Sequence, residues 1–279
     1  MKKLLIAGFG DIARRAAPQL QARYSVQALS RRHGFDLDRP ETLAGLGAAD
    51  AVLHCAPPPA TGTADTRTRN LLAALASGGI LPARVVYVST CGVYGDCGGA
   101  LVDETRTVNP QSPRARRRAH AEAQLALWCT RHAVALVVLR APGIYAPDRL
   151  PLERLRAGTP VLRGEDDVYT NHIHADDLAG ICARSLDDDA PPGTYNASDD
   201  TQLKMSAWFD LVADRTGLPR PPRIARSEAT KRVAPGLLSF MNESRRLDNA
   251  RLKRKLGARL RYPTVHEGLR GLEGLAHDK

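Results

Sequence analysis

The residues best suited to chemistry open the chain, where a short apolar run leads into a glycine turn and then into a helical pattern. Residues 4–7 are apolar, and the spacing Gly8-x-Gly10-x-x-Ala13 follows at once. A strand, turn and helix of this kind hold a dinucleotide pyrophosphate, because the glycines allow a tight turn and the helix N-terminus offers free N–H groups. The predicted contacts of the turn are Gly8, Phe9, Gly10, Asp11, Ile12 and Ala13.

A second signal follows the next predicted strand, residues 24–29. Ser30, Arg31 and Arg32 lie roughly 20 positions beyond the glycines, where the cofactor is selected. NAD sites place a carboxylate there for the ribose 2′-hydroxyl, whereas guanidinium groups pair with phosphate. We therefore expect NADP, with NAD as the alternative; the competing interpretation is that both arginines are solvated loop charges. Ala56 and Pro57, at the end of a later strand, complete this predicted site.

Composition limits the class of protein. The 279 residues are 43% hydrophobic and carry a formal net charge of +10. The basic residues are scattered without interleaved aromatics, so we expect no nucleic-acid partner. Five cysteines show no C-x-x-C pair and no metal-ligand spacing, which indicates free thiols in a reducing compartment and no metal. Since the sequence has no apolar stretch long enough to cross a bilayer, we expect a cytoplasmic protein without a membrane partner.

Strand and helix patterns alternate through the first half of the chain. Residues 51–56, 84–89 and 134–139 are predicted strands, and residues 65–77 and 119–131 are predicted helices. This alternation indicates an α/β fold, a Rossmann-type doubly wound parallel sheet with right-handed crossovers.

Prolines and glycines interrupt this rhythm after Arg140. We predict a cofactor domain over 1–145, to which residues 174–198 return, and a smaller, mostly helical substrate lobe over 146–279. Asp176, Ser206 and Asp248 are predicted helix caps, and Thr264-x-x-Glu267 forms a capping box.

Four stretches resemble the extended short-chain dehydrogenase/reductase family, which includes nucleotide-sugar epimerases and dehydratases. They are the glycine turn and residues 89–95, 140–147 and 171–179, in the family's order. The resemblance implies a bound nicotinamide dinucleotide and a substrate lobe over the carboxyl ends of the strands. It also implies catalysis by a Ser or Thr, a Tyr, and a Lys four residues after the Tyr.

The family's hydroxyl position falls on Thr90, but the Tyr and Lys positions depart from the pattern. Members carry a Glu four residues beyond the Lys, and Glu122 fits that place. Counting back gives Arg118 for the Lys and Arg114 for the Tyr. A guanidinium, with a pKa above ~12, cannot replace a tyrosine as proton donor at neutral pH, so another group must do the acid–base work or the redox cycle is not run.

The remaining candidates follow from the resemblance, and each has a structural alternative. Tyr94 is the predicted substitute acid, and Arg118 and Pro142 are predicted to contact the cofactor. The predicted substrate contacts are Cys91, Tyr145 and Asn171. Arg114 and Arg118 either form an anion site or are solvated residues just before a helix. An H-x-H metal pair at His172 and His174 lacks a third ligand, so we expect no metal there.

These expectations describe an NADP-binding, epimerase-like oxidoreductase that transfers hydride to or from a sugar-like or polyhydroxylated small molecule, neutral or anionic. The alternative is a catalytically inactive NADPH-binding sensor or regulatory protein. Family members often pair through two long helices, so a homodimer is one option.

Overall fold

The larger lobe is built on a six-stranded parallel sheet in the order β11-β6-β4-β3-β1-β2. The computed structural model describes residues 1–272, apart from the side chain of Pro235. The strands of the sheet are β1 (Lys2–Ala7), β2 (Tyr24–Leu29), β3 (Ala51–His54), β4 (Arg84–Thr90), β6 (Ala135–Ala141) and β11 (Gly193–Asn196). β2 pairs with one side of β1, and the chain then crosses to the other side of β1 to form β3. Ligands bind at such a switch point, outside the carboxyl ends of the strands.

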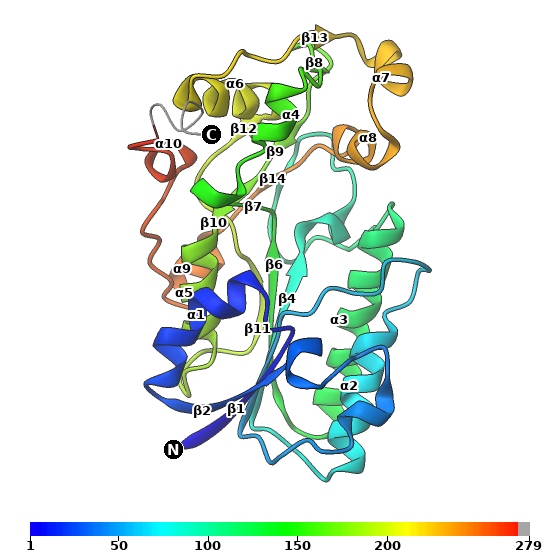
Figure 1. Cartoon of the computed structure of the whole chain (residues 1–279), viewed down its shortest axis with the longest axis vertical. Helices are drawn as coiled ribbons and strands as arrows, with labels where there is room; N and C mark the ends of the chain where they lie inside the picture. The colour runs from blue at the N-terminus through cyan, green and yellow to red at the C-terminus, as the bar shows by residue number, and fades with distance from the viewer. Residues whose placement is uncertain (273–279) are drawn as a thin grey trace.

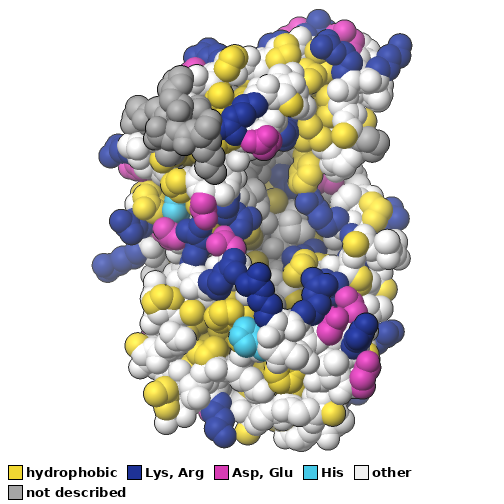
Figure 2. All heavy atoms as spheres, viewed as in Figure 1, with side chains coloured by type: hydrophobic (Ala, Val, Ile, Leu, Met, Phe, Trp, Pro, Cys, Tyr) yellow, Lys and Arg dark blue, Asp and Glu magenta, His cyan; other side chains and the backbone are white. Residues whose placement is uncertain are grey.

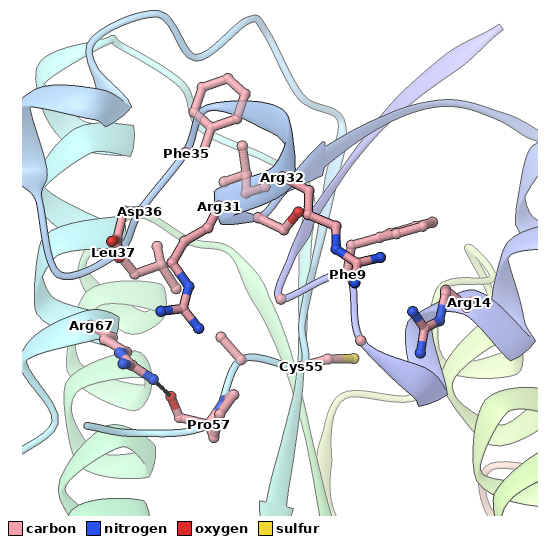
Figure 3. A pocket seen from close by; sticks show the side chains of 15 residues that line it. Phe9, Arg14, Arg31, Arg32, Phe35, Asp36, Leu37, Cys55, Pro57 and Arg67 are labelled. Atoms are coloured by element: carbon pink, nitrogen blue, oxygen red, sulfur yellow. Dashed lines mark hydrogen bonds between the residues drawn. The ribbon is translucent and has the colours of Figure 1, made fainter. Parts of the chain in front are cut away.

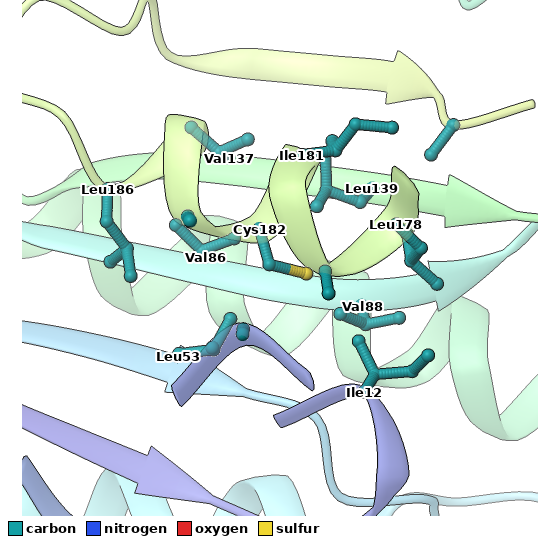
Figure 4. Packing of buried hydrophobic residues seen from close by; sticks show 14 of the residues in the cluster. Ile12, Leu53, Val86, Val88, Val137, Leu139, Leu178, Ile181, Cys182 and Leu186 are labelled. Atoms are coloured by element: carbon teal, nitrogen blue, oxygen red, sulfur yellow. The ribbon is translucent and has the colours of Figure 1, made fainter. Parts of the chain in front are cut away.

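Helices cover both faces of this sheet, which confirms the Rossmann-type fold (Figure 1). The helices α1 (Asp11–Gln21) and α5 (Ala175–Ser185) pack on one face, and α2 (Thr66–Ser77) and α3 (Pro113–Arg131) pack on the other. Figure 4 shows Ile181 and Cys182 of α5 directed toward Val86 and Leu139 of the sheet. Because both faces are buried, the middle residues of the central strands, such as 85–88 and 136–139, are apolar.

Short 3-10 helices connect these elements: η1 (Arg31–His33), η2 (Pro40–Leu43) and η3 (Cys91–Tyr94). The smaller lobe lies beyond the carboxyl ends of the strands (Figure 1). Short strand pairs link it to the large lobe and hold it together: β5 (Leu101–Val102) with β14 (Arg246–Leu247), β7 (Gly143–Tyr145) with β10 (His172–His174), β8 (Val161–Leu162) with β13 (Arg223–Ile224), and β9 (Tyr169–Thr170) with β12 (Leu203–Lys204).

The remaining helices are η4 (Pro147–Arg149), α4 (Leu152–Arg156), α6 (Met205–Thr216), α7 (Arg226–Arg232), α8 (Pro235–Met241), α9 (Ala250–Arg254) and α10 (Val265–Gly268). The core of the small lobe forms around Trp208, Phe209 and Val212 of α6. The two lobes are interleaved along the chain: Leu252 and Leu256, late in the sequence, are buried in the core of the large lobe.

Helix starts were the least accurate sequence predictions. Helix α3 begins at Pro113 rather than at residue 119, because Ser112 caps it by accepting from Ala115 N at 3.2 Å and Pro113 is the first helical residue. Arg114 and Arg118 therefore lie within the helix, not before it. His174, not Asp176, caps α5. The capping box at Thr264 and Glu267 is confirmed.

The predicted N-caps of two later helices were also wrong. Ser206 lies inside α6, whose N-cap is Lys204, and the Ser206 N–H donates to Asp167 at 2.8 Å. Asn249 is the N-cap of α9, while the neighbouring Asp248 accepts from Ala250 N at 2.7 Å. At α6 the carboxylate of Asp167, distant in sequence, satisfies a first-turn N–H group, whereas at α9 Asp248 does so from the position before the N-cap.

Candidate functional site

The glycine turn after β1 packs tightly against the end of β3. Gly8 has a φ of +86°, and a Cβ on it would lie 2.5 Å from Ala56 Cα, so glycine is required there. The backbone N–H groups of Ile12 and Ala13, in the first turn of α1, have no acceptor within residues 1–272. Free N–H groups at a helix N-terminus favour a phosphate ligand. The turn therefore fits the pyrophosphate of a dinucleotide.

A cavity of about 370 Å³ opens over this turn at the switch point of the sheet, and we call it the nucleotide cavity. Its lining comes from the turn, the end of β2, η1 and the loop after β3. It brings together the predicted contacts Gly8, Phe9, Gly10, Ser30, Arg31, Arg32, Ala56 and Pro57. It also includes residues that were not predicted: Arg14, Leu29, Phe35, Asp36, Leu37, Cys55 and Arg67.

Arginines surround the nucleotide cavity. Figure 3 shows the guanidinium groups of Arg14, Arg31 and Arg32 directed toward its interior. Within the described part of the chain, none of the three has a hydrogen-bond or ion-pair partner. Arg67 differs, because it pairs with Asp38 at 2.6 and 2.8 Å and donates to Pro57 O at 3.0 Å. Three unpaired cations around one cavity favour an anionic ligand.

The side chains of three predicted cofactor contacts point elsewhere. Asp11 accepts from Arg15 Nε at 3.0 Å and from Arg149 at 2.7 Å, which ties α1 to the η4 segment. Ile12 and Ala13 are buried in the core. These three residues can reach a dinucleotide only through their backbone.

A second cavity, of about 310 Å³, lies between the carboxyl end of β4 and the small lobe, and we call it the interlobe cavity. Figure 2 shows the molecule hollowed between the lobes, with Lys and Arg side chains gathered beside the hollow. The predicted residues brought together there are Thr90, Cys91, Arg114, Pro142 and Asn171. Others were not predicted: Gly92, Gly143, Ile144, Arg149, Tyr169, Thr170, Met205, Phe240, Glu243 and Arg245.

Thr90 and Cys91 form the sheet side of the interlobe cavity. Thr90 Oγ1 accepts from Gly92 N at 3.2 Å, which caps η3. Cys91 is 6% exposed, and its Sγ lies 3.7 Å from a terminal nitrogen of Arg245. A hydroxyl and a thiol thus lie side by side where the strand ends.

The two arginines at the family's Tyr and Lys positions have different surroundings. Arg114 is exposed, lines the interlobe cavity and stacks 4.3 Å from the centre of the Phe240 ring. Arg118 donates to Val88 O at 2.8 Å and to the Tyr87 hydroxyl at 3.0 Å. Burial raises the pKa of that tyrosine to about 12, so the phenol stays protonated.

Tyr94, the predicted substitute acid, does not line the interlobe cavity, so the structure does not support that role. It is 1% exposed, and its hydroxyl donates to Asn196 Oδ1 at 2.8 Å. The Arg140 guanidinium lies 4.7 Å from its ring centre. Burial raises the pKa of Tyr94 to about 12. Burial and this hydrogen bond give the phenol a structural role that links η3 to β11.

Tyr145 and Asn171 also have structural roles. Tyr145, a predicted substrate contact, is 2% exposed, packs against Gly268 and lies edge-on to His174, and it does not line the interlobe cavity. Asn171 borders the interlobe cavity, but its amide donates to Arg245 O at 2.9 Å and accepts from Leu247 N at 2.8 Å. Its polar atoms are occupied by the β14 segment.

Glu122, the residue from which the family's Lys and Tyr positions were counted back along the sequence, lies behind the interlobe cavity. It pairs with Arg140 at 2.8 Å and accepts from Ser89 Oγ at 2.5 Å. Both side chains are nearly buried, with 13% and 9% exposure. This pair ties α3 to β4 and β6 next to Thr90.

The histidines of the β10 segment are parts of the fold. Burial lowers the pKa of His172 to about 3, and His174 accepts from Asp176 N at 3.2 Å. Within residues 1–272, no three His, Cys, Asp or Glu side chains are grouped as metal ligands would be. No helix in that range is long and apolar enough to cross a membrane.

Several solved structures have a fold similar to that of this chain. A functionally unknown conserved protein from Silicibacter pomeroyi is 29% identical, with 98% of each chain covered and a TM-score of 0.80. The RMD protein from Pseudomonas aeruginosa, solved with NADPH, is 21% identical over 98% of each chain, with a TM-score of 0.75. UDP-glucose 4-epimerase from Thermotoga maritima, solved with UDP-glucose, is 18% identical over 96% of each chain, with a TM-score of 0.77.

The last two identities are low enough that these likenesses show the fold alone. A search of curated proteins found no match. The model of the NAD dependent epimerase/dehydratase family matches residues 5–198, which include the glycine turn, β4, α3 and α5. The chain therefore belongs to the NAD dependent epimerase/dehydratase family.

Proposed function

We propose that this protein is an NADP-dependent oxidoreductase that transfers hydride to or from a sugar-like or polyhydroxylated small molecule. The observation that carries the choice of NADP is the set of unpaired guanidinium groups of Arg14, Arg31 and Arg32 around the nucleotide cavity. A 2′-phosphate carries the charge that such a set can neutralise. Neighbours with this fold are solved with NADPH or with NAD, so they support a nicotinamide dinucleotide, and the arginines carry the choice between the two.

The residues present fit a dinucleotide. Gly8 and the free N–H groups of α1 would hold the pyrophosphate, and Arg31 and Arg32 would hold the phosphorylated adenosine ribose. When bound, the nicotinamide supplies a hydride donor or acceptor. Asp36 lines the same cavity and is the carboxylate that would favour NAD instead.

An affinity comparison tests this choice of cofactor. In the double variant Arg31→Gln/Arg32→Gln we expect the Kd for NADPH to rise roughly 10- to 100-fold and the Kd for NADH to change little, because charge-assisted hydrogen bonds to the phosphate are lost. Arg39→Gln is the matched control, since Arg39 is exposed and does not line the cavity. Equal losses for both dinucleotides, or tighter binding of NADH by the unaltered protein, would contradict the assignment.

Proton transfer requires a group in the interlobe cavity, and we assign it to Cys91. Tyr94 does not line the cavity, and its hydroxyl donates to Asn196. Of the two neighbouring side chains Cys91 and Thr90, the thiol releases a proton far more readily than the hydroxyl. In the oxidative direction Cys91 Sγ, as thiolate, would take the proton of the substrate hydroxyl, while the carbon-bound hydrogen would pass as hydride to the oxidised nicotinamide. In the reductive direction the thiol returns that proton to the carbonyl oxygen. The Thr90 hydroxyl would hydrogen-bond to the same substrate oxygen and orient it toward Cys91 Sγ.

The second candidate function, an NADPH-binding regulator without turnover, is favoured by the arginines at the family's Tyr and Lys positions. Turnover of NADPH across a panel of carbonyl sugars and hydroxy acids distinguishes the two. The enzyme should oxidise NADPH with at least one compound, and Cys91→Ala should lower that rate about 100-fold or more with an unchanged Kd for NADPH. Tight NADPH binding with no turnover of any compound supports the regulator, and full activity in Cys91→Ala refutes the assignment of the thiol.

A further inference from the structure

Two thiols meet where the nucleotide cavity borders the core of the large lobe. Cys55 directly follows β3, and because successive side chains of a strand alternate between the two faces of a sheet, it shares its face with Leu53. Cys182 lies on the side of α5 that packs on this same face (Figure 4). Both cysteines belong to one hydrophobic cluster, and the side chain of Cys182 hydrogen-bonds to that of Cys55.

The other three cysteines lie in different parts of the core. Cys129 belongs to the cluster on the opposite face of the sheet, under α2 and α3. Cys91 and Cys97 lie together in a small cluster at η3. The fold therefore brings Cys55 into contact with one particular thiol, that of Cys182, although the two are far apart in the sequence.

The two thiols differ in their access to solvent. Cys55 is partly exposed, and its side chain is among those that line the nucleotide cavity (Figure 3). Cys182 is fully buried, at 0% exposure. The hydrogen bond to Cys55, together with burial, raises the pKa of Cys182, so this thiol stays protonated at neutral pH. A dissolved oxidant can thus reach Cys55 directly, whereas Cys182 reacts only with Cys55.

The surroundings of Cys55 suit a reaction with an oxidant. Cysteines that respond to oxidants are accessible and lie in electropositive surroundings, often next to a second cysteine that completes a disulfide. The nucleotide cavity opens to solvent at Cys55, and Arg14, Arg31 and Arg32 line it as well. Cys182 occupies the place of the second cysteine.

We propose that Cys55 and Cys182 form a reversible disulfide when a peroxide enters the nucleotide cavity, and that a dinucleotide bound there covers Cys55 and prevents the reaction. The first half depends on the positions of the two thiols alone. The second half rests on the proposed function, because it requires that the cavity bind a dinucleotide. In the oxidised form, α5 would be covalently joined to the end of β3.

The reaction takes two steps. Hydrogen peroxide transfers an oxygen to Cys55 Sγ, so that an S–O bond forms, the O–O bond breaks, and water leaves. Cys182 Sγ then attacks the sulfur of this sulfenic acid; the S–S bond forms, the S–O bond breaks, and the oxygen leaves as a second water with the proton of the Cys182 thiol. The two thiols lose two electrons in total, which reduce the peroxide to water.

The test is peptide mapping of the whole chain, reduced beforehand and then treated with hydrogen peroxide. Trypsin should release residues 33–67 and 164–184 joined by a disulfide; each of these peptides contains a single cysteine. We expect dithiothreitol to separate them. With NADP⁺ at about 20 times its Kd, the cavity is empty in about 5% of the molecules, so the rate of disulfide formation should fall about tenfold or more.

Two variants locate the reaction. Cys182→Ala removes the second thiol but keeps Cys55, so peroxide should carry Cys55 on to the sulfinic acid, which dithiothreitol does not reverse. Cys97→Ser is the matched control, because Cys97 is also partly exposed but lies in the separate cluster at η3. It should form the joined peptide at the rate of the unaltered chain within about twofold. Circular dichroism checks that both variants fold, and the mapping of the unaltered chain depends on neither.

The proposal is overturned if peroxide does not join Cys55 to Cys182 in the folded chain, or joins them only after unfolding in urea. Shielding by the dinucleotide is refuted if bound NADP⁺ leaves the rate unchanged. The proposed function fails separately, when calorimetry detects binding of neither dinucleotide. The disulfide would then still form, and NADP⁺ would not slow it.

Discussion

The buried pair between Glu122 and Arg140 should stabilise the fold far more than a surface pair, and Glu122→Gln tests this. The carboxylate pairs with Arg140 at 2.8 Å and accepts from Ser89 Oγ at 2.5 Å. A glutamine oxygen can still accept from Ser89, but the guanidinium loses its carboxylate. A terminal nitrogen of Arg140 already lacks a partner among the described residues, so this buried cation would keep only the Nε contact to the same oxygen, at 3.3 Å, and the Tyr94 ring.

Removing one partner from a buried ion pair costs about 3–5 kcal/mol. We therefore expect Glu122→Gln to lower the unfolding free energy by that amount, and the Tm by on the order of 10 °C. Glu153→Gln is the matched control, because Glu153 makes the same kind of pair with Arg156 at 2.6 Å but its side chain is 89% exposed. Exposed pairs contribute about 0–1 kcal/mol.

The assay is urea unfolding followed by circular dichroism, with Tm values measured alongside. The double variant Glu122→Gln/Arg140→Met also removes the unpaired guanidinium and should recover at least half of the lost unfolding free energy. The reasoning is refuted if Glu122→Gln loses no more than Glu153→Gln, or if the double variant is less stable than the single one.

Two further predictions concern the glycine turn and a buried carboxylate. Gly8→Ala should lower the unfolding free energy by roughly 1–2 kcal/mol or more, as measured by urea unfolding, because Gly8 has a positive φ and a Cβ there would contact Ala56. Gly10→Ala should fold normally, because its Cβ would meet nothing within 4 Å, but calorimetry should show a loss of NADPH affinity. Burial raises the pKa of Asp199 to about 7, so the folded state keeps a proton that the unfolded chain releases near pH 4, and stability should fall as pH rises from about 4 to about 7. At about 1.4 kcal/mol per pH unit the loss is up to about 4 kcal/mol; Asp199→Asn should abolish it, and identical pH profiles of the two proteins would exclude this explanation.

Much of the large lobe could be predicted because its signals are local. The apolar runs of β1, β3 and β4 follow from burial on both faces of a parallel sheet, and the glycine turn requires a particular backbone conformation at Gly8. Arg31 and Arg32 follow β2 directly, so their place at the nucleotide cavity follows from the strand order. The helix starts were less predictable, because a cap such as Ser112 or His174 competes with several neighbouring polar residues.

The residues of the interlobe cavity could not be found in this way. Tyr94 and Cys91 are three positions apart in η3, and the sequence does not say which of the two turns toward the core; packing against Asn196 and Arg140 decides it. Arg245 meets Cys91 across 154 positions of sequence, and no spacing rule connects them.

The sequence by itself determined the strand–turn–helix that fits a pyrophosphate, the cations beside the predicted adenosine ribose, and the absence of the family's Tyr-x-x-x-Lys pair. Each depends on residues within one or two turns of chain, where backbone conformation and residue type suffice. Only the tertiary structure decided which polar groups are consumed by the fold, as in Tyr94 and Asn171, and which remain free, as in Arg114 and the Nε of Arg245. The physical reason is that the availability of a donor depends on acceptors brought near it by distant segments, and the local sequence does not contain them.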